Sequence, residues 1–342
     1  MIGLEKGMNQ STRAPSGKKS AGKTPSSTTE DTEQKGRRRG FLIASLIIVV
    51  LAIAIGIGYY LIYARPLQTK IIVVGEDSIN IGYFIKRLRM EITAGVGGDP
   101  TVMLETLTHE MLIRQGAPRY GIEATDDDID ETLREIARGQ SEAISDSEFN
   151  EWYRQQLNES ELSDSEYRDS VRTFLLRLRL HEYLAERVPT VTEQVHLHII
   201  IVETYEDALE VRERWEAGED FADLAREVSI DEESREKGGD VGWYPPGVLD
   251  SSFMWAAVNL DIGEVSTPLR AGDLAFSLVM ISEKAVAREL DEESLALLRA
   301  KVLDDWLVVE MGYKKVEFHG FKNGFDSETY AWIQWQLSKG ER

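Results

Sequence analysis

The sequence contains no cysteine among its 342 residues. This absence excludes disulfide bonds, thiolate catalysis, zinc–thiolate sites and a lipid anchor on an N-terminal cysteine. Histidine is scarce, with five residues, and the formal net charge is −21. Because so acidic a chain repels phosphate backbones and anionic headgroups, we expect no nucleic-acid partner and no attraction to an anionic membrane surface.

The charge is distributed unevenly along the chain. Residues 1–40 hold nine Lys and Arg against four Asp and Glu, a net charge of +5, so the remainder carries −26. Residues 1–36 are rich in Ser, Thr, Gly and Lys and show no apolar periodicity. This composition predicts a disordered tail on the cytoplasmic side of the membrane.

An uncharged apolar run from Phe41 to Tyr63 follows the tail, within a segment expected to cover residues 37–65. Its 23 residues would extend about 34 Å as a helix, slightly more than a bilayer core of roughly 30 Å. Arg37, Arg38 and Arg39 precede it, which by the positive-inside rule places the N-terminus in the cytoplasm. A cleaved signal peptide is the alternative, but it would have a shorter apolar region followed by small residues. We therefore expect an uncleaved signal anchor that makes this a single-pass cell-membrane protein with an extracytoplasmic body.

Residues 71–190 read mainly as helices. A short strand at Ile71–Val74 and a turn at Gly75–Ser78 precede helical patterning that starts near Asn80 and resumes at Met103. Three later helices begin with capping boxes, in which a hydroxyl and a carboxylate three residues later satisfy free backbone N–H groups; they start at Thr125 with Asp128, Ser145 with Glu148, and Ser163 with Glu166. The last of these carries an apolar face and stops before Pro189; the face consists of Val171, Phe174, Leu175, Leu178, Leu180 and Leu184.

Two further helices are expected in residues 290–342. Asp291 to Met311 carries an apolar face made of Leu295, Leu298, Val302, Trp306 and Val309. Asp326 to Leu337 is rich in aromatic residues, and we expect it to pack back onto the helical region. A membrane-surface helix is the rival interpretation of Trp332 and Trp335, but such helices usually carry more cations than are found here.

Between these helical regions, four segments in one order and spacing resemble a parvulin domain, the small peptidyl-prolyl cis/trans isomerase module. They are Val195 to Val202, Gly218 to Ala225, Gly238-Gly239-Asp240-Val241-Gly242-Trp243, and Gly263-Glu264-Val265-Ser266. The resemblance implies a small antiparallel sheet with helices around it over residues 194–284, in the order β-α-α, short helix, β-β. The strand and helices upstream, including Ile122-Glu123-Ala124-Thr125, resemble the N-terminal region of SurA- and PrsA-type foldases. The expected fold class is thus α+β: a transmembrane helix, a mostly helical SurA-like chaperone lobe completed by the C-terminal helices, and an inserted parvulin-like domain.

The resemblance also implies a set of site residues. His198, Asp231 and Ser277 take the catalytic positions, while Val241, Trp243, Leu249 and Phe253 line a pocket for the proline ring. The family usually has a second histidine on the last strand, in a pattern such as Gly-Tyr-His-Ile-Ile. Here the corresponding residues are Ala275-Phe276-Ser277-Leu278-Val279, so Ser277 stands in that place and is able at most to hydrogen-bond to His198.

The chemistry of prolyl isomerisation agrees with the absence of other catalytic motifs. The barrier to amide rotation, ~18–20 kcal/mol, comes from resonance, so a catalyst needs an apolar slot and a fixed polar network around the carbonyl, without a nucleophile, metal or cofactor. Strand alternation places His196 and His198 on one face, where they could be two metal ligands or plain core histidines. No third ligand stands at a recognisable spacing, so we expect no metal and no cofactor.

Three functions are compatible with the sequence. The first is a membrane-tethered foldase whose isomerase acts on exported, proline-containing polypeptides, because X–Pro isomerisation takes tens to hundreds of seconds uncatalysed. The second is a catalytically weak or inactive parvulin-like holdase whose helical lobe binds unfolded clients, an alternative that the Ser277 replacement favours. The third is a structural partner of the secretion or cell-envelope machinery, for which no residue gives positive evidence.

Overall fold

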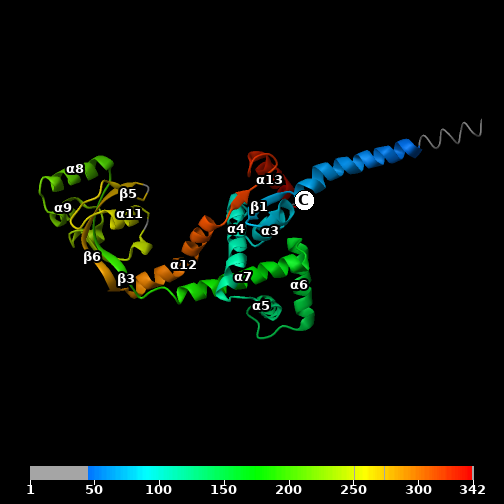
Figure 1. Ribbon diagram of the computed structural model, residues 1–342, viewed down its shortest axis with the longest axis horizontal. Coiled ribbons are helices and arrows are strands. Elements are labelled where there is room, and N and C mark those ends of the chain that lie inside the picture. The colour runs from blue at the N-terminus through cyan, green and yellow to red at the C-terminus, as the bar shows by residue number, and fades with distance from the viewer. Residues whose placement is uncertain (1–44, 250, 273, 341–342) are drawn as a thin grey trace, which may run out of the picture. The chain divides into compact units, whose positions relative to one another are not determined.

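The structure is a computed structural model that describes residues 45–249, 251–272 and 274–340 (Figure 1). The predicted cytoplasmic tail, residues 1–36, and the arginines at 37–39 lie outside the described residues, as do the first four residues of the predicted membrane span. The expected α+β fold class is confirmed: helices dominate, and the strands form two small antiparallel sheets.

One described helix, Ser45–Leu67, is long and apolar enough to cross a membrane. It includes a π-helical stretch, η1 (Tyr60–Ala64), and ends with α2 (Arg65–Leu67). The apolar run identified in the sequence ends at Tyr63, and the helix itself continues to Leu67. A signal sequence meets the same criteria of length and composition.

A mostly helical region, here called the helical lobe, is built from both ends of the remaining chain. Its strands form a three-stranded antiparallel sheet in the order β2-β1-β7. The strands β2 and β7 were not expected from the sequence, where Gly75–Ser78 was interpreted as a turn. The elements of the lobe are β1 (Lys70–Val74), β2 (Asp77–Asn80), α3 (Ile81–Thr93), α4 (Pro100–Gly116), η2 (Ala117–Tyr120), α5 (Asp126–Arg138), α6 (Asp146–Ser160), α7 (Asp164–Ala185), α12 (Glu292–Tyr313), β7 (Val316–Phe318) and α13 (Ser327–Gly340).

The helix starts in the lobe follow the predicted capping chemistry. Thr125, Ser145 and Ser163 are the N-caps of α5, α6 and α7, and each forms a complete capping box with its carboxylate partner. The carboxylate of Asp128 also accepts two hydrogen bonds from Arg179 on α7. These hydrogen bonds and those from Thr125 hold the pKa of Asp128 well below its usual range.

The core of the lobe joins residues that are distant in sequence. Ile71, Ile72, Phe84 and Leu88 from the N-terminal part lie in one buried cluster with residues of α12 and α13, namely Leu303, Trp306, Leu307, Ile333 and Leu337. This confirms the prediction that the C-terminal helices complete the lobe.

Two predicted apolar faces were partly wrong. On α12 Leu303, Trp306, Leu307 and Glu310 are buried, so Trp306 is confirmed, whereas Val309 is 54% exposed. Glu310 pairs with Arg119, a partner that hydrophobic periodicity cannot reveal. On α7 the side chains of Phe174 and Leu178 are half exposed, since α7 contributes to two different cores through its other faces.

The second region, here called the sheet module, runs from β3 to β6. Its four strands form an antiparallel sheet in the order β4-β3-β6-β5. Two strands, β5 and β6, follow the short helix α11 as expected, but the expected order lacked β4, which precedes α11. The elements are β3 (Val191–Val202), α8 (Tyr205–Glu216), α9 (Phe221–Val228), α10 (Glu232–Arg235), β4 (Asp240–Tyr244), η3 (Pro246–Val248), α11 (Ser251–Asn259), β5 (Leu269–Ala271) and β6 (Ala275–Glu289).

Each face of this sheet has its own apolar cluster. Ile200, Val202 and Leu278 pack with residues of α8 and α9 on what we call the α8–α9 face. On the opposite face, the α11 face, Ala256 and Ala257 of α11 pack against four residues of β3 and β6. These residues are Val195, Leu197, Val279 and Ile281. The register therefore assigns each side chain of β3 and β6 to one face.

The N-cap of α13 generates a pH-dependent contribution to stability. Asp326 accepts hydrogen bonds from the backbone N–H of Thr329, at 2.8 Å, and from its hydroxyl, at 2.7 Å. These bonds lower the pKa of Asp326 to about 2. Since the folded pKa lies below the unfolded value of about 3.9, the stabilisation is present above that value and is lost as the pH falls toward 2.

We predict that Asp326→Ala lowers the melting temperature at pH 7 and that this difference shrinks as the pH falls from 5 to 2. Thermal unfolding of both proteins followed by circular dichroism at each pH measures it. A difference that stays constant over this range would show that the carboxylate charge of Asp326 does not stabilise the fold.

Candidate functional site

Three of the predicted pocket residues come together on the α11 face of the sheet module. Val241 on β4, Leu249 after η3 and Phe253 on α11 are partly buried, and they pack against the same apolar cluster. Tyr244 joins them, although sequence reasoning missed it. The sequence shows that Tyr244 lies in the same strand as Val241. It does not show the bulge in β4, which puts both side chains on one face of the sheet.

Asp231 lies beside this apolar group. Its carboxylate caps the short helix α10 by accepting from the backbone N–H of Ser234, at 3.1 Å, and from the Ser234 hydroxyl. Asp231 and Val241 line one hollow together with Tyr244. Burial raises the pKa of Tyr244, and the carboxylates of Glu293, Glu233 and Asp291 raise it further. The hollow is mainly polar, and Asp240 and Lys237 also line it beside Val241 and Tyr244.

The two histidines of β3 lie on the other face. His198 stands opposite Asp240 on β4 and Met280 on β6, and Met280 packs on the α8–α9 face. His196 stands opposite Trp243, and its ring stacks on the indole with centroids 5.1 Å apart. Trp243 is thus placed against His196 and away from Val241, Leu249 and Phe253, which differs from its predicted place in the proline pocket.

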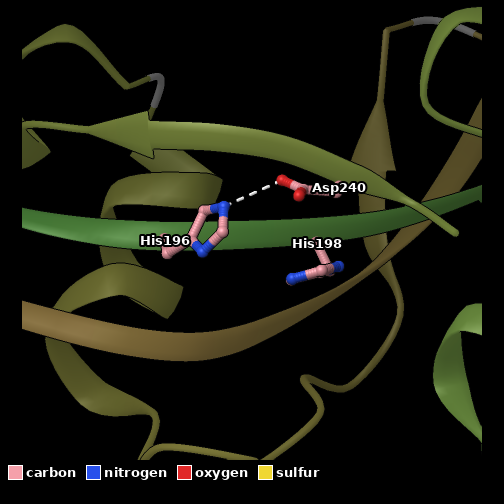
Figure 2. Close-up of side chains that lie close together, drawn as sticks. All are labelled: His196, His198 and Asp240. Atoms are coloured by element: carbon pink, nitrogen blue, oxygen red, sulfur yellow. Dashed lines mark hydrogen bonds and ion pairs between the residues drawn. The ribbon is translucent and has the colours of Figure 1, made fainter. Parts of the chain in front are cut away.

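A carboxylate completes this histidine group (Figure 2). His196 Nε2 lies 2.9 Å from Asp240 Oδ1, and the same oxygen accepts from the backbone N–H of Gly242 at 2.8 Å. The imidazole centroids of His196 and His198 are 5.3 Å apart. No sequence spacing joins Asp240 to the histidines, because Asp240 comes from a strand that lies more than forty residues later.

Ser277 is fully buried in β6 and stands opposite Ile201 and Leu269. Its neighbours of the same register, Val279 and Ile281, belong to the α11 face. His198 and Ser277 therefore lie on opposite faces of the sheet, so the hydrogen bond considered between them does not form. The Ser277 hydroxyl has no hydrogen-bond partner among the described residues.

The structure thus divides the predicted site into two groups. The slot group consists of Val241, Leu249 and Phe253, with Asp231 at its border and Ser277 on the same face of the sheet. The histidine group consists of His198 and Trp243, together with His196 and Asp240. An apolar surface beside a fixed carboxylate can contact a proline ring and act on the polarity of its amide, which is the chemistry that lowering a rotational barrier requires.

Comparisons with known proteins match two parts of the chain. Residues 201–283 match a family model described as the PPIC-type PPIASE domain. Residues 34–181 match a family model described as the SurA-like N-terminal domain. The first match covers the slot group and most of the sheet module. The second covers the apolar helix and most of the N-terminal part of the helical lobe.

Curated relatives carry one recurrent name. A foldase protein PrsA of Caldanaerobacter subterraneus is 30% identical over 171 residues, which is 49% of this chain and 52% of the relative. Another, of Geobacillus kaustophilus, is 37% identical over 93 residues, which is 27% of this chain and 33% of the relative. The chain thus matches about a third to a half of the length of these relatives. A crystal structure of the peptidylprolyl isomerase PrsA from Bacillus cereus is similar at 18% identity and a TM-score of 0.37, covering 80% of this chain and 92% of that one.

The turn into β4 generates a test of the close packing that positions Asp240. Gly239 has φ +80°, and a Cβ there would lie 2.5 Å from the backbone oxygen of Ile199. Gly263 has nearly the same φ, +83°, but its Cβ would meet no atom within 4 Å. At both positions a side chain costs free energy because the backbone is left-handed. Only at Gly239 would the side chain also overlap with a backbone atom.

We predict that Gly239→Ala destabilises the protein clearly more than Gly263→Ala, whose cost is about 1–2 kcal/mol from the backbone conformation alone. Urea unfolding of both variants measures the difference. Equal destabilisation would contradict the close approach of Gly239 to β3.

Proposed function

We propose that this chain, which carries a SurA-like N-terminal domain and a PPIC-type PPIase domain, is a membrane-tethered foldase that isomerises X–Pro bonds in exported polypeptides. The curated foldase relatives and the apolar helix Ser45–Leu67 support this proposal. The proposed domains are the anchor at 37–65, the chaperone lobe at 71–190 with 290–342, and the isomerase domain at 194–284. The body lies outside the cytoplasm.

The slot group is the observation that carries the proposal. Leu249 and Phe253 approach Val241 from the segment that follows β4, and all three are partly buried on one apolar cluster. A proline ring has the size and polarity to pack on the apolar surface that these residues form. Gripping the ring leaves its amide at the rim, beside the carboxylate of Asp231, where the planar amide can be twisted.

The roles of the polar residues follow from this placement. Asp231 borders the slot and fixes α10, so it is proposed to orient the polar rim. Ser277 is proposed to act from beneath the slot, where its buried hydroxyl lies on the α11 face. His198 lies on the opposite face, so its proposed role is to hold β3 and β4 in register rather than to touch the client.

The proposed isomerase function predicts that the slot group determines the rate of cis/trans exchange. The full chain in detergent micelles should accelerate cis/trans exchange of a short X–Pro peptide, and Leu249→Ala should lower kcat/KM by roughly tenfold or more, because lost apolar contacts with the substrate cost about 1–3 kcal/mol. Leu209→Ala on α8, an exposed leucine of the same module, is the matched control and should change nothing. If the unaltered chain does not accelerate the exchange, the enzymatic proposal is wrong.

A second function, holdase activity, is favoured by an apolar groove in the helical lobe. Met90 on α3, Ile136 on α5, and Val171 and Phe174 on α7 line it. Ile136 and Phe174 are half exposed, and exposed apolar groups at a concave surface are suited to binding apolar segments. Arg87 and Glu110 also line the groove, joined by two hydrogen bonds of 2.7 Å.

We predict that Phe174→Ser combined with Ile136→Ser weakens the suppression of client aggregation without changing the exchange rate of a short X–Pro peptide. Light scattering of a diluted, denatured client measures the first effect. Leu297→Ser on α12 removes an equally exposed leucine outside the groove and serves as control. Unchanged suppression in the double variant would rule out this groove as the client site.

A further inference from the structure

The histidine group carries an inference that the proposed isomerase does not use. His196, His198 and Asp240 each offer one ligand atom, and these three atoms lie within 4.8 Å of one another. Sequence spacing supplied only two ligands and therefore predicted no metal. The structure brings a third candidate ligand, Asp240, beside them by pairing β4 with β3.

His196 Nε2 faces the Asp240 carboxylate at 2.9 Å. An ion bound by both groups would take the place of the ring proton between them, because metal ligands are deprotonated. His196 Nδ1 and His198 Nδ1 are both buried, and neither has a hydrogen-bond partner among the described residues. An ion bound by His198 Nδ1 would supply the partner that this atom lacks.

The backbone around the histidines is arranged to bring the three ligands together. The pairing of β3 with β4 shifts between Leu197 and His198, and the pairing of β3 with β6 shifts between His196 and Leu197. Such bulges re-aim side chains and occur often beside functional sites. Here both shifts lie between His196 and His198, one toward each neighbouring strand, and the Asp240 carboxylate lies beside the histidines on β4 (Figure 2).

The ring of His196 is held in place before any ion binds. It stacks nearly parallel on Trp243, at 7° between planes, and the guanidinium of Arg288 lies 4.6 Å from the Trp243 centroid. Glu283 stands opposite His196 on β6 and adds a further carboxylate near the group. The group is partly exposed, with 19% of the His196 side chain and 38% of the Asp240 side chain accessible, so an ion can enter from solvent.

We propose that His196, His198 and Asp240 form a binding site for a divalent transition metal of the zinc class. Two imidazoles and one carboxylate suit Zn²⁺, Co²⁺ and Ni²⁺, whereas Mg²⁺ and Ca²⁺ prefer oxygen ligands alone. Three protein ligands leave a fourth position for water. A bound ion would link β3 to β4 across the bulge.

Metal titration of the full chain in detergent tests the site. After chelator treatment, calorimetric titration with ZnCl2 in excess Mg²⁺, which occupies the acidic surface, should reach one Zn²⁺ per chain. His198→Ala and Asp240→Asn should each weaken binding by at least about tenfold, as even loss of an outer-shell partner costs 10–100-fold. The asparagine keeps an oxygen for the Gly242 N–H, so this variant preserves the turn.

His319→Ala is the matched control. His319 also lies beside a carboxylate, that of Glu317 at 3.9 Å, but it belongs to no three-ligand group among the described residues. It should bind Zn²⁺ like the unaltered chain. Co²⁺ should give the visible absorption of a tetrahedral site in the unaltered chain and lose it in His198→Ala. Unaltered affinity in His198→Ala and Asp240→Asn, or binding lost in His319→Ala, overturns the proposal. Ion binding is read directly, so the outcome does not depend on isomerase activity.

Discussion

The antiparallel pairing of β3 with β6 is the interaction on which the sheet module depends. It runs from Val191 opposite Glu289 to Val202 opposite Phe276, and it joins chain segments separated by more than seventy residues. Closing so long a loop costs conformational entropy. The cost is offset by apolar side chains on both faces of these two central strands, which pack against α8 and α9 on one side and α11 on the other.

The same pairing explains why the site is divided. A side chain of a paired strand can only lie on one face or the other. Because Ser277 follows the register of Val279, and His198 that of Ile200, no rotamer change can bring them together. Any catalytic role for both residues must therefore pass through the sheet itself, by its twist and stiffness, and not through a direct contact.

The helical lobe shows how polar contacts fix a long-range arrangement. The returning helix α12 packs on α7 and α4 with Leu303 and Leu307 in the core. Trp306 Nε1–H donates to the Tyr120 hydroxyl at 3.0 Å, and Glu310 pairs with Arg119 at 2.5 Å. Because Glu310 is buried and Arg119 is half exposed, loss of the arginine would leave a buried carboxylate without its partner.

The sequence allowed the local features to be predicted well. The capping boxes at Thr125, Ser145 and Ser163 depend on residues three positions apart, so they are visible in the chain and are confirmed. The α+β class and the returning C-terminal helices were also predicted correctly. What could not be predicted depends on register: the bulge that puts Trp243 against His196, the approach of Asp240, and the pairing that buries Glu310. These arise only when distant strands or helices meet, and no short spacing records them.

The ends of the β3–β6 pair have one further consequence. Leu290 N–H donates to the Thr190 oxygen at 2.9 Å, just before Val191 pairs with Glu289. The chain therefore enters and leaves the sheet module at neighbouring points. A short turn joining residue 190 to residue 290 would leave a continuous helical lobe. The module can therefore be gained or lost in evolution without a change in the chain path of the lobe.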